Sequence, residues 1–216
     1  MLITLNGLAC AGKGTIARAL AQATGIPYID LGLVFRLSAY ALHTGVCSRM
    51  TDVKTLFSSQ RAQYVWDGRQ AAMLLDGKNI TAVLYAPDIA QATARLSSVP
   101  ANLRVLTQLA NTLLQGKKDV ICDGRSAGTI ILPHADFKFY ITADEQVRAR
   151  RRYVDLSMQN PHLSYEQVLR DIRERDQLDR QRVYDPLAVP EGAYTIDTGR
   201  STVEESVQTI RNIIGR

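Results

Sequence analysis

The spacing of apolar and polar residues along this chain predicts strands that alternate with helices. Short apolar runs, such as those at 119–123 and 137–141, are typical of buried parallel strands, which read as near-continuous hydrophobic stretches. Between them, apolar residues recur three and four positions apart, as in amphipathic helices. This alternation predicts an α/β fold in three layers, with a parallel five-stranded sheet in the middle. The expected strands are 2–5, 26–30, 119–123, 137–141 and 194–197.

A segment after residue 50 departs from this alternation. An expected helix at 51–60 is followed by strand-like runs at 63–66 and 72–75, which Asp67-Gly68 joins. Two such runs with an Asp-Gly turn between them are typical of a β-hairpin. The segment is therefore predicted to be a small insert in the main domain.

Polar residues and glycines predict where the helices begin and end. Ser or Thr followed three residues later by Glu or Gln has the spacing of a capping box. Gly25 is expected to end the first helix, and Pro100 to interrupt the helical segment 88–115. The expected caps are Thr51, Thr142, Ser164 and Ser201.

The glycine-rich stretch 7–15, with the sequence GLACAGKGT, is the most informative part of the chain. It lies between an apolar strand and a helix, as a phosphate-binding loop requires. Its backbone N–H groups and the start of the helix would attract phosphate. Lys13 can reach the outer phosphates of a nucleoside triphosphate, and Thr15 can ligate magnesium. The residues predicted to bind ATP here are Gly7, Ala11, Gly12, Lys13, Gly14 and Thr15.

One departure from the strict phosphate-loop pattern narrows the interpretation. The pattern places Ser or Thr directly after the lysine, whereas Gly14 stands there and Thr15 follows. Gly-Lys-Gly-Thr is the form of this motif found in nucleoside monophosphate kinases. The alternative is a glycine-rich turn with a surface lysine, which the flanking strand and helix disfavour.

A second candidate site follows the expected strand 119–123, which ends in Asp123-Gly124-Arg125. Ligands of open α/β sheets bind beyond the carboxyl ends of the strands. Asp123 is therefore expected to face the same crevice as the phosphate loop, where it would hold magnesium or a magnesium-bound water. The alternative is an acid that merely ends a strand in a turn.

The helix expected after Ser164 has an apolar stripe that becomes ionic halfway along. Buried charge without partners is costly, so the pattern predicts either internal ion pairs or an arginine-lined wall that Asp179 orients. Arg148 and Arg152 lie four residues apart on the preceding helix, share a face and favour the wall. The stripe consists of Tyr165, Val168, Leu169, Ile172, Arg175, Asp179 and Arg182.

Composition and charge restrict the class of protein. The 216 residues suffice for one α/β domain, and 46% hydrophobic with 22% charged residues indicates a globular chain. We expect a cytoplasmic protein, because we find no signal peptide, no membrane-spanning run and only three scattered cysteines. The net charge of +5 suits a polyanionic small ligand, and the arginines lack the interleaved aromatics typical of nucleic-acid binding.

Over nearly its whole length the sequence resembles the bacterial cytidylate kinase family. The similar segments are 7–15, 30–36, 123–129, 172–187 and the hairpin at about 62–80. The resemblance implies a P-loop NTPase fold over 1–216, with a monophosphate-binding insert at about 31–115 and a short lid at about 151–184. The core would then consist of 1–30, 116–150 and 185–216.

The resemblance also implies an activity, namely transfer of the ATP γ-phosphoryl group, with Mg²⁺, to CMP, dCMP or a related acceptor. The protein would act as a monomer without nucleic-acid or membrane partners. Arg148 and Arg152 would lie on the donor side, and Thr15 with Asp123 would hold the metal. The implied catalytic residues are Lys13, Arg125, Arg175 and Arg182; the implied acceptor-binding residues are Arg36, Arg104, Ser126, Asp179 and Arg182. Arg104 stands one residue further from Pro100 than in the family.

The departures from the family cluster on the acceptor side. Leu31 and Ala94 replace serines, Ser126 replaces an aspartate, and Phe35 replaces a tyrosine. In the family these polar groups recognise cytosine and ribose, and loss of a hydrogen bond to substrate changes discrimination strongly. Two alternatives therefore remain at this point: a kinase of the same scaffold with another small-molecule acceptor, or an ATP-binding module without transferase activity.

Overall fold

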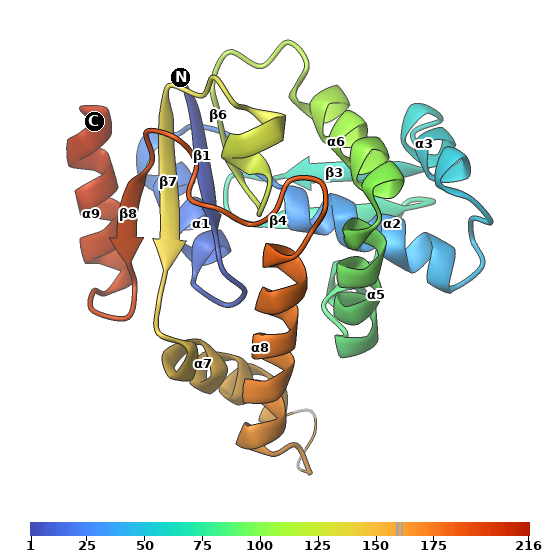
Figure 1. Ribbon diagram of the computed structural model, residues 1–216. Helices are drawn as coiled ribbons and strands as arrows, with labels where there is room; N and C mark the ends of the chain where they lie inside the picture. Colours follow the sequence, from blue (N-terminus) through green and yellow to red (C-terminus); the bar gives the residue numbers. More distant parts are fainter. Residues whose placement is uncertain (159, 161) are drawn as a thin grey trace.

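The computed structural model describes residues 1–158, 160 and 162–216 of the chain (Figure 1). The strands are β1 (Leu2–Gly7), β2 (Tyr28–Asp30), β3 (Ala62–Trp66), β4 (Ala71–Leu75), β5 (Lys78–Asn79), β6 (Val120–Asp123), β7 (Phe137–Thr142) and β8 (Tyr194–Asp197). The helices are α1 (Lys13–Thr24), α2 (Leu31–His43), α3 (Met50–Ser58), α4 (Thr81–Leu84), α5 (Pro87–Ser98), α6 (Pro100–Leu114), α7 (Glu145–Ser157), α8 (Tyr165–Arg180) and α9 (Val203–Ile214). A π-helical turn, η1, spans Ala127–Ile131.

The main sheet has five parallel strands, as the sequence predicted, and their order is β2-β6-β1-β7-β8. Leu5 of β1 is in register with Asp123 of β6, and Asp30 of β2 is in register with the same aspartate. Since parallel strands end at the same edge, the phosphate loop and both aspartates meet there. The sheet thus brings together three segments that are far apart in the sequence.

Helices cover both faces of this sheet, which gives three layers (Figure 1). Alternate residues of β6 point to opposite faces. Ile121 packs into a cluster with side chains of α1 and α9, whereas Val120 and Cys122 pack with side chains of α6 and η1. Ile121, Val120 and Cys122 are fully buried, so the sheet lies at the centre of the core.

The predicted hairpin forms a second, antiparallel sheet of β3, β4 and the short strand β5, which the sequence did not predict. Its Met73 is fully buried in a separate cluster with side chains of α2 and α3. The hydroxyl group of Tyr64 on β3 donates to the carbonyl oxygen of Tyr28 at 3.0 Å and accepts from the N–H of Asp30 at 3.0 Å. The insert is therefore attached to the outer edge of β2.

Two predicted helix ends are confirmed. Gly25 follows α1 in the left-handed conformation, with φ of 72°, which glycine adopts without strain. Ser164 caps α8, because its hydroxyl oxygen accepts from the N–H of Gln167 at 3.1 Å. The side chain of Gln167 donates to Asp171 at 2.7 Å.

The other three predicted caps are wrong by one or two residues. Asp52 accepts from the N–H groups of Ser48 and Arg49, so α3 begins at Met50 rather than after Thr51. Asp144 caps α7, since Thr142 is still part of a strand. Thr202 and Glu205, not Ser201 and Glu204, form the capping box of α9.

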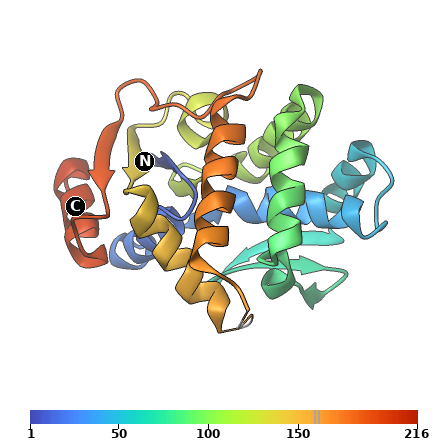
Figure 2. The ribbon, with the colours of Figure 1, turned by 60° about the horizontal axis from the view of Figure 1, so that its bottom comes forward.

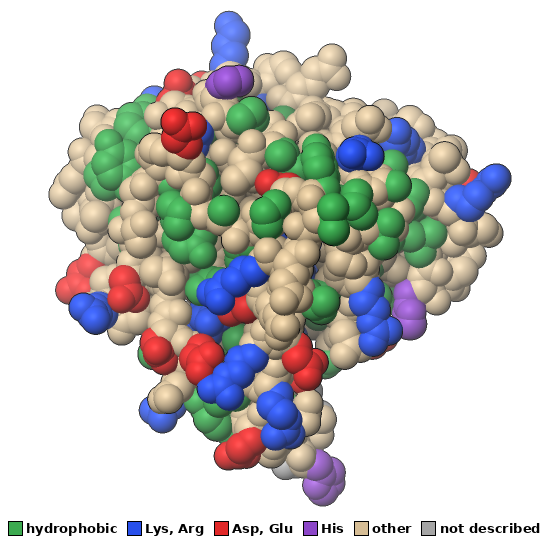
Figure 3. Space-filling view, in the orientation of Figure 1, with side chains coloured by type: hydrophobic (Ala, Val, Ile, Leu, Met, Phe, Trp, Pro, Cys, Tyr) green, Lys and Arg blue, Asp and Glu red, His purple; other side chains and the backbone are tan. Residues whose placement is uncertain are grey.

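Helices α7 and α8 form a hairpin at one end of the molecule, and α5 lies beside α8 (Figure 2). Charged side chains of both signs cover this hairpin on the face seen in Figure 3. Positions 159 and 161, within the predicted lid, lie outside the described residues. In the described part of the chain, no helix combines the length and apolar character needed to span a bilayer.

Candidate active site

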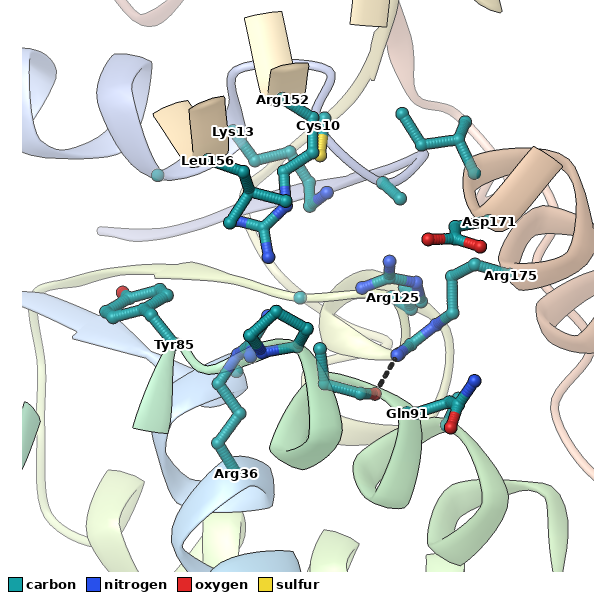
Figure 4. Close-up of a pocket in the computed structure, with 18 of the residues that line it drawn as sticks. Cys10, Lys13, Arg36, Tyr85, Gln91, Arg125, Arg152, Leu156, Asp171 and Arg175 are labelled. Atoms are coloured by element: carbon teal, nitrogen blue, oxygen red, sulfur yellow. Dashed lines mark hydrogen bonds between the residues drawn. The ribbon is translucent and has the colours of Figure 1, made fainter. Parts of the chain in front are cut away.

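A cleft of about 920 Å³ opens beyond the carboxyl ends of the parallel strands. Seven cationic side chains, drawn from several elements and turns, line it: Lys13, Arg18, Arg36, Arg95, Arg125, Arg152 and Arg175. Figure 4 shows Lys13 and Arg152 on one side of the opening, Arg36 on the other, and Arg125 with Arg175 between them. The lysine of the loop and the arginine-bearing helix α8 thus face the same space.

The loop between β1 and α1 has the geometry of an anion-binding nest. Gly12, just before α1, adopts φ of 88°, and no side chain caps this helix, so its first N–H groups remain available to a ligand. Gly7 adopts φ of 143°, and a Cβ there would lie 1.9 Å from the carbonyl oxygen of Ile141. A side chain at position 7 would therefore force the loop away from β7.

Lys13 is folded back on its own loop. Its Nζ donates to the carbonyl oxygen of Leu8 at 2.7 Å, and the residue is only 8% exposed. Burial, reinforced by the positive charge of Arg125, lowers the pKa of Lys13 to about 8. A phosphate in the loop would raise this pKa again, because an opposite charge at short range favours the charged form.

Asp123 is buried at the end of β6, where Oδ1 accepts from the Tyr28 hydroxyl at 2.7 Å. Burial and the nearby carboxylate of Asp30 raise the pKa of Asp123 to about 7. Asp30 itself caps α2 through Oδ1, which accepts from Leu33, while Oδ2 accepts from the Tyr85 hydroxyl at 3.2 Å. Two carboxylates close together disfavour ionisation, and a cation between or beside them would relieve that.

The residues present fit a magnesium ion that also binds phosphate. Asp123 and Thr15 both line the cleft and offer oxygen ligands. In the described residues no cluster of three or more acidic, His or Cys side chains is available to hold a metal. Mg²⁺ usually takes one or two carboxylates and fills its shell with waters and substrate phosphates, so this donor set suits it.

Behind the cleft, Asp179 on α8 gathers three arginines. It is 1% exposed and contacts Arg125, the Nε of Arg175 at 3.1 Å and Nη2 of Arg182 at 2.5 Å. Burial raises the pKa of Asp179, but the three guanidinium groups outweigh it and hold that pKa below its usual value. Burial and the charge of Arg125 lower the pKa of Arg175 to about 10. The ionic half of the stripe is therefore an arginine-lined wall with internal pairing, so both readings of the pattern apply.

A smaller cavity of about 50 Å³ extends inward from the cleft. Arg182 lines this cavity rather than the cleft, and its Nη2 donates to the hydroxyl oxygen of Ser97 at 2.9 Å. Ser126 borders the same cavity and is 2% exposed, and its buried Oγ has no hydrogen-bond partner. Leu31 and Phe35, two of the positions that depart from the family, form part of its apolar wall.

Two predicted site residues lie elsewhere. Arg148 is 4% exposed, and its Nη1 donates to Asp176 at 2.6 Å and to the carbonyl oxygen of Ala9 at 3.2 Å. It supports the loop from behind, whereas Arg152, one turn further along α7, reaches the cleft. Arg104 is exposed and lies 5.0 Å from the centre of the Tyr184 ring.

Sequence reasoning missed three residues that shape the site. Tyr85 lines the cleft, binds Asp30 and lies under the guanidinium group of Arg36, 5.1 Å from its ring centre. Ser97 positions Arg182, and Asp176 positions Arg148. Neither Tyr85 nor Ser97 belongs to a motif; Asp176 lies in the ionic part of α8, where the charge pattern pointed to internal pairing.

Known proteins resemble the chain over its whole length. The family model for cytidylate kinase matches residues 3–216. A cytidylate kinase of Caldanaerobacter subterraneus subsp. tengcongensis is 35% identical over 212 residues, which cover 98% of this chain and 93% of that protein. A cytidylate kinase of Carboxydothermus hydrogenoformans is 32% identical over 218 residues, which cover 100% of this chain and 98% of that protein.

Solved structures support the fold alone. A shikimate kinase from Bacteroides thetaiotaomicron matches with a TM-score of 0.51 and 14% identity over 99% of this chain and 98% of that one. An uncharacterized protein from Eubacterium ventriosum matches with a TM-score of 0.53 and 13% identity, and the match covers 100% of this chain and 99% of that one.

Proposed function

The chain belongs to the cytidylate kinase family, as its sequence predicted, and from that premise we propose that it transfers the γ-phosphoryl group of ATP to CMP or dCMP. One observation carries the proposal beyond the family name. Lys13 of the phosphate loop faces the same cleft as Arg125 and Arg175, two of the arginines held by Asp179, so a donor and an acceptor phosphate can be bound close together.

The reaction needs positioning and charge compensation more than covalent help. An oxygen of the acceptor phosphate attacks the γ-phosphorus while the bond to the bridging β–γ oxygen breaks, and ADP leaves. The negative charge of the group in transit spreads over its outer oxygens. Arg125 and Arg175 suit that charge, since a guanidinium group donates two parallel hydrogen bonds to phosphate. Arg125 follows β6 and Arg175 lies on α8, so two separate elements position these charges at one place.

On the donor side, we assign the nest of the loop and the start of α1 to the ATP phosphates. Lys13 would exchange the carbonyl oxygen of Leu8 for a phosphate oxygen, and its pKa would rise from about 8 as it does so. Asp123 and Thr15 would hold Mg²⁺, which supplies further neutralisation of the phosphates when bound. Arg152 would reach the same phosphates from α7.

On the acceptor side, we assign the insert at about 31–115 and the inner cavity to the nucleoside monophosphate. Arg36 lines the cleft from α2. Its Nη1 donates to the carbonyl oxygen of Leu84 at 2.9 Å, and this hydrogen bond orients the guanidinium group. Asp179 keeps Arg175 and Arg182 extended toward the acceptor instead of toward solvent. The α7–α8 hairpin would act as the lid that excludes water and limits ATP hydrolysis.

A coupled assay of ADP formation tests the proposal. With ATP and Mg²⁺ we expect turnover of CMP or dCMP at about 1–100 s⁻¹, the usual range of kinases. Lys13→Ala should abolish turnover with an unchanged circular dichroism spectrum, whereas Lys117→Ala, at an exposed position, should not. ATP binding without any ADP formation in response to CMP or dCMP would contradict the proposal.

A further inference from the structure

The family assignment does not say which edge of the base the inner cavity accepts. The cavity shares Arg36, Arg125 and Arg175 with the cleft, so it is the inner end of the acceptor site assigned above. Its volume of about 50 Å³ exceeds the share of one water in the liquid, about 30 Å³, but not by much. It therefore has room for the leading edge of a base while the phosphate remains among the arginines of the cleft.

The walls of the cavity suit a flat apolar ring better than a second phosphate. Leu31, Phe35 and Ile131 line it, and Leu31 and Ile131 are buried. Its polar side chains are of two kinds. Guanidinium groups, including that of Arg182, can only donate hydrogen bonds. The hydroxyl groups of Thr93 and Ser126 can donate and accept.

Among the described side chains that line the cavity, none is a carboxylate. Asp179 lies nearby, but its oxygens contact Arg125, Arg175 and Arg182. The hydroxyl group of Thr93 donates to the carbonyl oxygen of Ile89 at 2.6 Å. Ser126 is thus the lining hydroxyl whose buried oxygen has no partner within the protein, and such a group is costly unless a ligand satisfies it.

The two common pyrimidines differ at the edge that would meet Ser126. Cytosine presents an amino donor, whereas a keto pyrimidine presents a carbonyl acceptor at the same position. The hydroxyl group of Ser126 accepts from the first and donates to the second, and the guanidinium groups favour the second. Strong discrimination requires a group that repels the wrong substrate, and this cavity contains none against a keto edge.

Resting on the proposed function, we infer that Ser126 makes the acceptor site tolerant at the pyrimidine edge, so that the enzyme phosphorylates UMP as well as CMP. We expect kcat/KM for the two acceptors to differ by less than about tenfold, since a single hydroxyl partner serves both. Ser126 is the residue that sets this ratio, and it acts by direct contact with the base.

The test is the ratio of kcat/KM for CMP to that for UMP, measured with saturating ATP in the wild type and three variants. Ser126→Asp introduces an acceptor-only group and should raise the ratio at least about tenfold. Ser126→Ala removes the hydroxyl acceptor but leaves the guanidinium donors, which suit a keto edge, so it should lower the value for CMP more than that for UMP and reduce the ratio. Thr129→Val removes another buried, unpartnered hydroxyl three residues along the same turn and should change neither value.

A wild-type preference for CMP above about tenfold, or a Ser126→Asp variant that keeps the wild-type ratio, would overturn the inference. Either result leaves CMP turnover, and hence the proposed function, intact. Absence of turnover with CMP and dCMP in the wild type would instead overturn the proposed function itself. Thermal unfolding of each variant shows whether it is folded, and the ratio is unaffected by the fraction of active enzyme.

Discussion

Replacing Asp179 by Asn tests whether one buried carboxylate holds the acceptor-side arginines in place. Asp179 is 1% exposed and contacts Arg125, Arg175 and Arg182. Asn keeps the size and one acceptor oxygen but removes the negative charge. The variant therefore leaves three guanidinium groups close together without the one carboxylate that contacts all of them.

The size of the effect follows from burial. Removing one partner of a buried ion pair costs about 3–5 kcal/mol. We expect the lower end, about 3 kcal/mol, because the side chains of Arg125 and Arg175 remain 21% and 18% exposed and can recruit water. In a chain of this length 1 kcal/mol shifts Tm by about 2–4 °C, so Tm should fall by about 6–12 °C.

The loss should also depend on pH in a defined direction. Burial raises the pKa of Asp179, but the three guanidinium groups outweigh burial and hold this pKa below its ordinary value. A group with a lowered folded pKa contributes stability above its unfolded pKa, about 3.9 for Asp, and loses it as the pH falls toward the folded pKa. The difference between wild type and variant should be full at neutral pH and shrink below about pH 4.

Urea unfolding at several pH values measures this difference directly, and acceptor KM should rise more than ATP KM in the same variant. Glu145→Gln is a matched control, since it removes the exposed ion pair with Arg173 and should cost less than about 1 kcal/mol. A loss below about 1 kcal/mol for Asp179→Asn, or an equal loss at pH 3 and pH 7, would refute the reasoning.

Three further predictions test other parts of the site. Because the pKa of Asp123 is raised to about 7 in the folded protein, ionisation of this carboxyl should lower the free energy of unfolding as the pH rises from about 4 to about 7. Asp123→Asn should remove this fall in the free protein. Urea unfolding at several pH values measures it. Arg104→Ala should change acceptor KM less than about threefold, whereas Arg36→Ala should raise it more than about tenfold, as initial rates would show. Arg148→Ala should destabilise the fold by about 3–5 kcal/mol in denaturant titrations, because it leaves Asp176 buried and unpaired; a loss under about 1 kcal/mol would contradict that.

The parts of this molecule that sequence reasoning predicted best are those in which one local pattern suffices. The strand, loop and helix at 2–24 follow from an apolar run, a glycine-rich turn and an alanine-rich helix in succession. The hairpin at 62–75 follows from alternation around Asp67-Gly68. Caps were less predictable, because Thr142 had the right spacing but was already committed to β7, so that Asp144 caps the helix instead.

Placement of the arginines required the tertiary structure. Arg148 and Arg152 share a helix face, yet one is buried against Asp176 and the other lines the cleft. The π-helical turn after Ser126 is five residues long and has no periodic signal, so neither it nor the inner cavity was predictable. Tyr85 lies in the short connection between α4 and α5, and no sequence pattern indicated that this connection reaches the site.

The hydroxyl group of Tyr64 has a consequence for how copies of this chain behave toward one another. β2 is an outer strand of the main sheet, and its free side would otherwise offer the C=O of Tyr28 and the N–H of Asp30 to any extended segment. One phenol satisfies both groups, as a neighbouring strand would. Because unpaired strand borders promote aggregation, we expect this single side chain to disfavour pairing between folded copies at high concentration.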